Sequence, residues 1–415
     1  MTTSIVIIFL IVYIGMILGG LPFVQLDRTG VALLGAIAMI SVDAVSLQEA
    51  AESVHLPTII LLFSFMVLSA QMRLGGFYDW VTRSLGARAL SPPRLLGAVM
   101  IVVAGLSAVF SNDIVCLAVA PVLIHVCIER RLDPIPYLLA LACAANIGSA
   151  ATLIGNPQNM LIGQTLRLSF AGYFAEALLP VAIGLVTTWG LIAWQTHDRW
   201  VLHDVAAAAH RAREQRDVDN PLDRWQTAKG LAVAAVLLMV FLFAPWPREH
   251  VALTAAGVLL MSRRLHSNKM LGLVDWELLV LFMGLFVVNH ALQRTGVTVT
   301  AVSDLTALGV DLRQPGPLFA ATFLLSNVVS NVPAVMLLLP LVQHPLAGPL
   351  LALVSTLAGN LLIVGSIANI IVVDAAARRG IRIDWRQHAR VGVPVTLATL
   401  AILAVYLWVR LRVMG

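Results

Sequence analysis

Ten long apolar runs divide this chain. Hydrophobic residues make up 59% of its 415 positions and charged residues only 12%, and a helix needs ~20 largely apolar residues to cross a bilayer. Because backbone in lipid must satisfy its own hydrogen bonds, we expect an all-α polytopic membrane protein. The expected spans are residues 3–21, 30–47, 56–72, 135–162, 174–196, 230–246, 250–262, 276–293, 346–373 and 391–409.

Two further apolar stretches, 95–128 and 315–343, each have a polar centre. The arms on either side of this centre are about 13–16 residues long, which is less than the ~20 that a full crossing needs. We therefore expect two re-entrant hairpins, whose arms return to the side from which they entered.

Basic residues indicate the orientation, because Lys and Arg gather in cytoplasmic loops. In the ten-span arrangement, four clusters of basic residues fall on the same side of the membrane. We therefore interpret the net charge of +5 as a determinant of membrane topology and expect no nucleic-acid partner. The polar segment 197–229 is expected to be a cytoplasmic linker, whose His197, His203 and His210 lie on a solvated face rather than in a metal site. Both termini are expected outside. The clusters are Arg83, Arg88 and Arg94; Arg130 and Arg131; Arg263, Arg264 and Lys269; and Arg378, Arg379, Arg382, Arg386 and Arg390.

The two halves of the chain share three motifs in the same order. An odd number of expected spans separates the members of each pair, so we expect two inverted repeats, 1–196 and 230–415, an architecture typical of secondary transporters. Each repeat contains one hairpin and one of the spans 135–162 and 346–373. The pairs are SNDIVCLAVAP from Ser111 with SNVPAVMLLLP from Ser330, GNPQNMLI from Gly155 with GSIANIIV from Gly365, and LLFSFM ending at Met66 with LLVLFM ending at Met283.

Polar residues interrupt these apolar segments at equivalent places. Gly155 with Pro157, and Gly365 with Ser366, are expected to break their helices. Such backbone is tolerated in a membrane only where it is buried in protein or lines a wet cavity, and the freed helix N-termini can bind an anion without Lys or Arg. The alternative is that these residues only join helices in lipid. The candidate substrate and ion site comprises Ser111, Asn112, Asp113, Gly155, Asn156, Asn159, Ser330, Asn331, Asn360, Gly365, Ser366 and Asn369.

Asp113 breaks the symmetry of the two hairpin tips, because Val332 takes its place in the second. A carboxylate near the membrane centre costs ~2.5–3.5 kcal/mol, and such residues usually carry protons or bind ions. We therefore expect Asp113 to couple transport to protons. The alternative is that it caps the following arm. Asp374, beside Arg378, is instead expected to form a surface ion pair.

The chain resembles the ion transporter superfamily, in particular the citrate-transporter-like domain of arsenite permeases, sodium-dicarboxylate symporters and bacterial anion permeases. The resemblance is carried by the two Ser-Asn tips and by the segments NIGSAATLIGNPQN and GNLLIVGSIANIIV. The resemblance covers nearly the whole chain. It implies that the tips and broken helices form the substrate and coupling-ion sites, with a sodium site at Ser111, Asn112, Gly155 and Asn156. It further implies elevator-type movement against scaffold helices that form a homodimer. Asp113 and Val332 replace the Thr that sodium-dicarboxylate members have at both tips.

These observations predict a secondary active transporter of a small anion or oxyacid in the plasma (inner) membrane. Proton coupling is preferred over sodium coupling, and no cofactor or resident metal is expected. The alternatives are an anion channel of the same architecture and an arsenite efflux permease proper. An enzyme is not expected, because the chain has no paired intramembrane aspartates and no hydrolase motif.

Overall fold

In the computed structural model, residues 1–21, 25–197, 199–201, 221–262 and 264–414 are described. The first half contains ten α-helices and a short two-stranded sheet. Their bounds are α1 Thr2–Leu18, β1 Gly20–Leu21, β2 Leu26–Asp27, α2 Arg28–Ser41, α3 Leu47–Ser53, α4 Leu56–Leu74, α5 Phe77–Gly86, α6 Pro92–Val109, α7 Asn112–Glu129, α8 Pro134–Ser149, α9 Pro157–Thr165 and α10 Phe170–Gln195.

The second half also contains ten described α-helices, with two short 3₁₀ turns, so the all-α prediction is confirmed. Their bounds are α12 Arg224–Phe243, α13 Arg248–Leu260, α14 Ser267–Leu271, α15 Trp276–Arg294, α16 Val297–Ala307, α17 Pro315–Val329, α18 Asn331–Leu338, η1 Leu339–Leu341, α19 Ala347–Ala358, η2 Ile363–Gly365, α20 Ile367–Ala377 and α21 Trp385–Met414.

Seven of the described helices are long and apolar enough to cross a membrane: α4, α6, α7, α10, α12, α15 and most of α21. The chain is a multi-pass membrane protein. The predicted hairpin arms of about 13–16 residues are wrong for the first hairpin, where α6 and α7 have 18 residues each. The difference arises at the helix ends, because α6 begins at Pro92, before the apolar stretch, and α7 includes Asn112 and Asp113 of the polar centre and ends at Glu129. In the second hairpin, α17 has 15 residues and α18 has 8.

The helices of the two halves follow one another in the same order and with similar spacing. Helices α4 and α15 both have 19 residues and begin at residues 56 and 276, 220 positions apart. Each is followed by a glycine with positive φ, Gly76 at 69° and Gly296 at 73°, before α5 or α16 begins. The match between LLFSFM and LLVLFM, with an offset of 217, is therefore three residues out of register with the helices that contain it.

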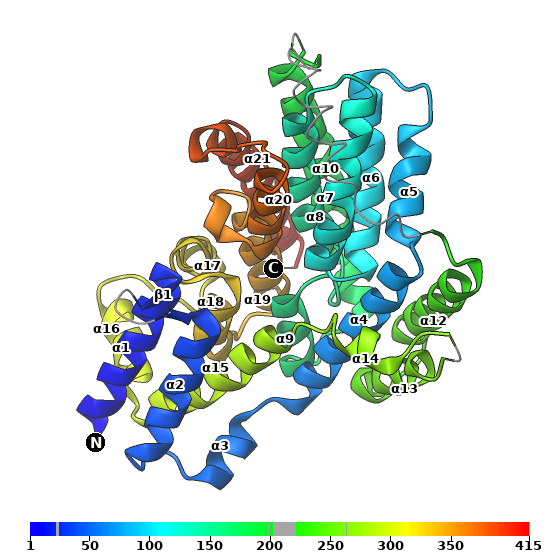
Figure 1. Cartoon of the computed structure of the whole chain (residues 1–415). Coiled ribbons are helices and arrows are strands. Elements are labelled where there is room, and N and C mark those ends of the chain that lie inside the picture. Colours follow the sequence, from blue (N-terminus) through cyan, green and yellow to red (C-terminus); the bar gives the residue numbers. More distant parts are fainter. Residues whose placement is uncertain (22–24, 198, 202–220, 263, 415) are drawn as a thin grey trace.

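Helices α8 and α19 form the centre of the molecule (Figure 1). All 12 residues of α19 are buried, and Ile135 is the single residue of α8 that is not. A helix that is apolar on every side needs such surroundings. Helix α6 approaches α8 closely at Gly148, where a Cβ atom would lie 2.3 Å from the Ala104 backbone of α6, and this contact helps to enclose α8.

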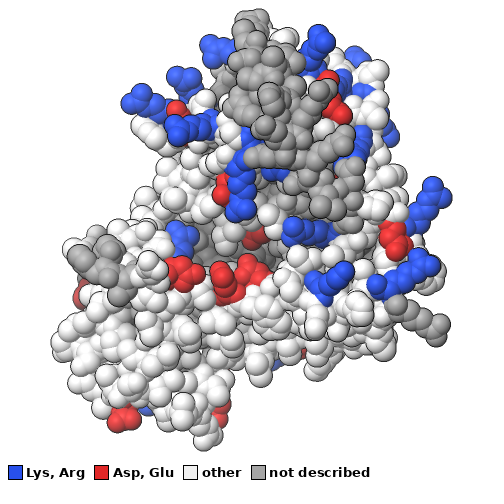
Figure 2. Space-filling model, in the orientation of Figure 1, with Lys and Arg blue, Asp and Glu red and all other residues white. Residues whose placement is uncertain are grey.

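Outer helices of each half pack against helices of the other half. Helix α2 packs against α15 and α13 packs against α4, while α10 and α21 pack against each other. Figure 1 shows α1–α3 and α16 at one end of the molecule and α12–α14 on the other side. Figure 2 shows Lys and Arg over the upper part and one side, with almost none on the lower part of this face. Exposed apolar side chains on α1, α2 and α16, such as Ile7, Leu34 and Val299, suit lipid contact.

Most of the predicted linker, 197–229, lies outside the described residues, as do His203, His210 and Arg263. Helix α12 begins at Arg224, six residues before the predicted start of the second half at residue 230. In the parts of the chain that the structure describes, no three His, Cys, Asp or Glu residues are grouped to hold a metal ion.

Candidate functional site

Each central helix ends abruptly inside the molecule. Helix α8 ends at Ser149 and α9 begins at Pro157, while α19 ends at Ala358 and α20 begins at Ile367. We call residues 150–156 the first break and residues 359–366 the second. Pro157 fits the first turn of a helix, and the Asn156 side chain caps α9 by accepting from the Asn159 N–H at 3.0 Å. Both segments therefore expose peptide groups that no helix pairs.

The first hairpin tip lies directly on the first break. The Asn112 N–H donates to the Gly155 carbonyl at 3.4 Å, and the Thr152 hydroxyl donates to the Ala108 carbonyl of α6. The Ser111 N–H donates to Ser69 Oγ of α4 at 3.3 Å. The structure thus brings together Ser111, Asn112 and Gly155.

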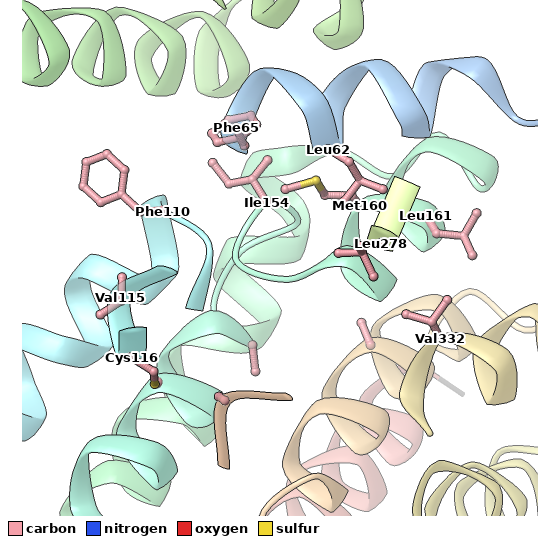
Figure 3. Packing of buried hydrophobic residues seen from close by; sticks show 14 of the residues in the cluster. Leu62, Phe65, Phe110, Val115, Cys116, Ile154, Met160, Leu161, Leu278 and Val332 are labelled. Carbon is pink, nitrogen blue, oxygen red and sulfur yellow. The ribbon is translucent and has the colours of Figure 1, made fainter. Parts of the chain in front are cut away.

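Apolar side chains close the other side of the first break. Figure 3 shows Ile154 near Leu62 and Phe65 of α4 and Met160 of α9, and all four belong to one buried cluster. Peptide groups of this break are consequently separated from lipid by packed side chains, which is the condition for irregular backbone in a membrane protein.

The second tip lies on the second break in a similar way. A Cβ at Gly365 would lie 3.5 Å from Asn327 Oδ1, and one at Gly359 would lie 3.3 Å from Asn331 Nδ2. The tip also approaches α1, because the Tyr13 hydroxyl lies 3.4 Å from the Pro333 carbonyl while donating to Asn289 Oδ1 of α15 at 3.0 Å.

The backbone differs between the two tips. Ser330 has φ 79° and ψ 159°, a region that is nearly restricted to glycine, whereas Ser111 has φ −57° and ψ 124°. We expect Ser330→Gly to raise the free energy of unfolding by about 1 kcal/mol, because relief of ~1–3 kcal/mol of strain exceeds the entropy cost of glycine. Melting midpoints of the purified protein measure this, with Ser111→Gly as the matched control. Equal midpoints for the two variants would show that Ser330 is unstrained.

A network of amide side chains joins the first tip to the second break. Asn146 of α8 accepts from Asn112 Nδ2 at 3.3 Å and from Ser366 Oγ at 2.9 Å. Its own Nδ2 donates to Asn360 Oδ1 at 2.9 Å and to Asn369 Oδ1 at 3.2 Å. The Asn146 side chain is therefore bonded at both ends, and all but one of its partners come from the second half of the chain.

Thr356 of α19 makes the corresponding contacts with the first half. Its hydroxyl accepts from Asn156 Nδ2 at 3.1 Å and from Gln158 Nε2 at 3.2 Å, and it lies 3.4 Å from Asn159 Oδ1. Asn159 also donates to the Thr152 carbonyl at 3.0 Å and to the Tyr173 hydroxyl at 3.2 Å.

Several oxygen atoms at the two tips are buried without a hydrogen-bond partner among the described residues. They include Ser107 Oγ and Asn112 Oδ1 at the first tip, and Ser326 Oγ, Asn327 Oδ1 and Asn331 Oδ1 at the second. Buried polar atoms are normally paired, so these oxygens are suited to hold a ligand or a small cation. The two serines and the Asn112–Asn331 pair are each 219 positions apart, the offset of the hairpin motif.

Asp113 lies in the first turn of α7 and is half-buried. Ser111 is the N-cap residue, and Asp113 accepts no hydrogen bond from the residues that the structure describes. Capping of α7 therefore does not account for this carboxylate. Asp374, by contrast, pairs with Arg378 at 2.8 Å on the surface, as predicted.

The comparisons with known proteins decide the family. The model of the citrate transporter family matches residues 8–358. The chain belongs to the citrate transporter family. An uncharacterized transporter of Mycobacterium tuberculosis is 30% identical over 421 residues, covering 94% of this chain and 96% of that protein. The silicon efflux transporter of rice, Oryza sativa, is 29% identical, covering 92% of each chain, and the inner membrane protein YbiR of Escherichia coli is 32% identical, covering 80% and 82%.

The structure of this citrate transporter family member places further residues beside the predicted ones, and the sequence motifs did not indicate them. Asn146 and Thr356 are 210 positions apart, which is also the offset between Gly155 and Gly365. The repeat therefore carried a signal that could have found this pair. Ser107, Ser326, Gln158, Asn327 and His388 were missed too, and the buried His388 ring lies 3.1 Å from the Asn360 carbonyl.

Proposed function

We propose that this protein is a secondary active transporter of a small anion or oxyacid. Its substrate binds between the two hairpin tips and the two breaks, and the site is exposed alternately to the two sides of the membrane. The observation that carries this proposal is the convergence of both tips and both breaks on buried oxygens and amides. The binding residues are Ser111, Asn112, Gly155, Asn156, Asn159, Ser330, Asn331, Asn360, Gly365, Ser366 and Asn369.

The two halves act as inverted repeats that move like an elevator against scaffold helices, which form a homodimer. The equal order of the helices and the crosswise packing of α2 with α15 and of α13 with α4 support this arrangement. Such repeats place the site near the bilayer midplane.

The polar site is built without Lys or Arg, so it favours a small substrate with hydroxyl groups or a delocalised charge over a highly charged one. Amide side chains and free peptide groups can donate to and accept from such a substrate. One relative is named for silicon efflux, and dissolved silicon is chiefly silicic acid, an uncharged oxyacid. Arsenite is the matching alternative substrate.

Protons drive the transport through Asp113, which has no counterpart at the second tip. Its place at the first hairpin tip, directly after Asn112 in the sequence, supports this role. Sodium is the alternative coupling ion and would use oxygens of Ser111, Asn112, Gly155 and Asn156.

Ligand-induced thermal stabilisation tests the site. The purified protein is melted with silicic acid, arsenite or citrate, at two pH values and with or without sodium. A ligand at a hundred times its Kd should add ~2.7 kcal/mol to the free energy of unfolding, because it binds only the folded state. Asn112→Leu should abolish this gain.

Thr188→Val, on α10, is the matched control and should retain the gain, because among the described residues the buried Thr188 hydroxyl bonds only to the Gly184 carbonyl of its own helix. Stabilisation that survives Asn112→Leu would place the ligand elsewhere. Currents far above the turnover of a transporter, measured in planar bilayers, would instead identify an anion channel.

A further inference from the structure

We propose that Asn146 and Thr356 are reciprocal positioning residues, each of which holds the break of the other half in shape. Asn146 belongs to the first half and bonds Asn360, Ser366 and Asn369 in and beside the second break. Thr356 belongs to the second half and bonds Asn156 in the first break. Each half thus supplies the residue that bonds the break of the other half.

The helices that follow the breaks also pack against the opposite half. Helix α20, which follows the second break, packs against α7 and α8 of the first half. Helix α9, which follows the first break, packs against α18 and α19 of the second half. Asn146 and Thr356 each lie within one turn of the end of their own helix, at Ser149 and Ala358. Both side chains are almost fully buried, with exposures of 2%.

These contacts determine break geometry because neither break has a continuous α-helical hydrogen-bond ladder, and the second break contains only the short 3₁₀ turn η2. Removal of Thr356 Oγ1 leaves Asn156 Nδ2 with one acceptor, Ser149 Oγ at 3.2 Å, and leaves Gln158 Nε2 with none among the described residues. Removal of the Asn146 amide leaves Asn360 Oδ1 and Asn369 Oδ1 without donors in the same way. An unpaired buried amide is costly, so each loss should loosen the break across the interface rather than the break on the same half.

This arrangement links the two half-sites energetically. A ligand or ion that changes the shape of one break also moves the residue that holds the other, and such linkage is reciprocal. The meaning of this coupling for transport rests on the proposed function, but its existence does not.

Hydrogen exchange of the ligand-free, full-length protein tests the coupling. In Thr356→Val we expect amides of residues 150–156 to exchange about tenfold faster, with residues 359–366 changed less than about threefold. In Asn146→Ala we expect the opposite pattern, with faster exchange at 359–366. A local structural role would loosen the break next to each mutation, and general destabilisation would loosen both breaks equally. Either result, or no change, would overturn the proposal.

Two variants of α19 make the test specific. Thr356→Ser keeps the hydroxyl and should restore slow exchange at 150–156. Ser355→Ala removes a neighbouring buried hydroxyl that, within the described part of the chain, bonds only to the Ala352 carbonyl of its own helix, and it should leave both breaks unchanged. If Asn146→Ala does not fold, the Thr356 series alone decides. A crossed exchange pattern in a protein that transports none of the three test solutes would uphold the coupling and reject the proposed function.

Discussion

Replacing Asp113 by Asn should abolish accumulation driven by a proton gradient. Each pH unit is worth about 1.36 kcal/mol per proton, so a gradient of two units can support up to about hundredfold accumulation for one coupled proton. The Asn side chain cannot take up or release that proton, although it has nearly the same size. We therefore expect the wild type to approach this ratio and Asp113→Asn to reach only equilibration.

The accumulation ratio can be measured in reconstituted vesicles, with buffers inside and outside that set the pH gradient. Arsenite, silicic acid or citrate serves as the solute and is labelled or detected analytically. Asp113→Glu keeps a carboxyl group and should retain part of the accumulation. Asp374→Asn is the matched control, because that carboxylate pairs with Arg378 on the surface. Accumulation by Asp113→Asn that still follows the pH gradient would remove Asp113 from the coupling. Accumulation that follows a sodium gradient instead would support the sodium alternative.

The breaks and the hairpin tips could be predicted because polar residues inside apolar runs have few acceptable explanations. Gly155 with Pro157 cannot continue a helix easily, and α8 and α9 are separated there. The equivalent expected span of the second half, 346–373, is likewise divided between α19 and α20. A membrane makes such signals strong, because lipid offers no partner for the freed peptide groups.

The contacts between the halves could not be predicted in this way. Asn146 and Thr356 lie near helix ends, where the sequence alone is equally compatible with a cap or a bond within the helix. Their partners are about 200 residues away, so only the packing of α8 and α19 identifies them. The length of the first hairpin was mispredicted because the polar centre was taken to separate its arms, whereas α7 includes Asn112 and Asp113 and continues to Glu129.

The two equivalent break glycines should respond very differently to the same substitution. A Cβ at Gly155 would lie 2.3 Å from the Ser149 carbonyl oxygen, 2.6 Å from Ser149 Cα and 2.8 Å from the Ser107 carbonyl oxygen. All three atoms are backbone and cannot rotate away. At Gly365 the nearest atom is the Gly359 carbonyl oxygen at 3.2 Å, followed by Asn327 Oδ1 at 3.5 Å.

We therefore expect Gly155→Ala to lower the free energy of unfolding by about 3 kcal/mol, at the upper end for overpacking, and Gly365→Ala by less than about 1 kcal/mol. Melting midpoints and the yield of monodisperse protein in detergent measure the difference. The reason lies in the backbone of Ser149 at the end of α8, which lies closest, and in the Ser107 carbonyl of the first hairpin, which together leave no room for a methyl group at Gly155. Equal losses at the two positions would mean that the first break can open by several tenths of an ångström, and hence that this tight contact is not fixed in the folded protein.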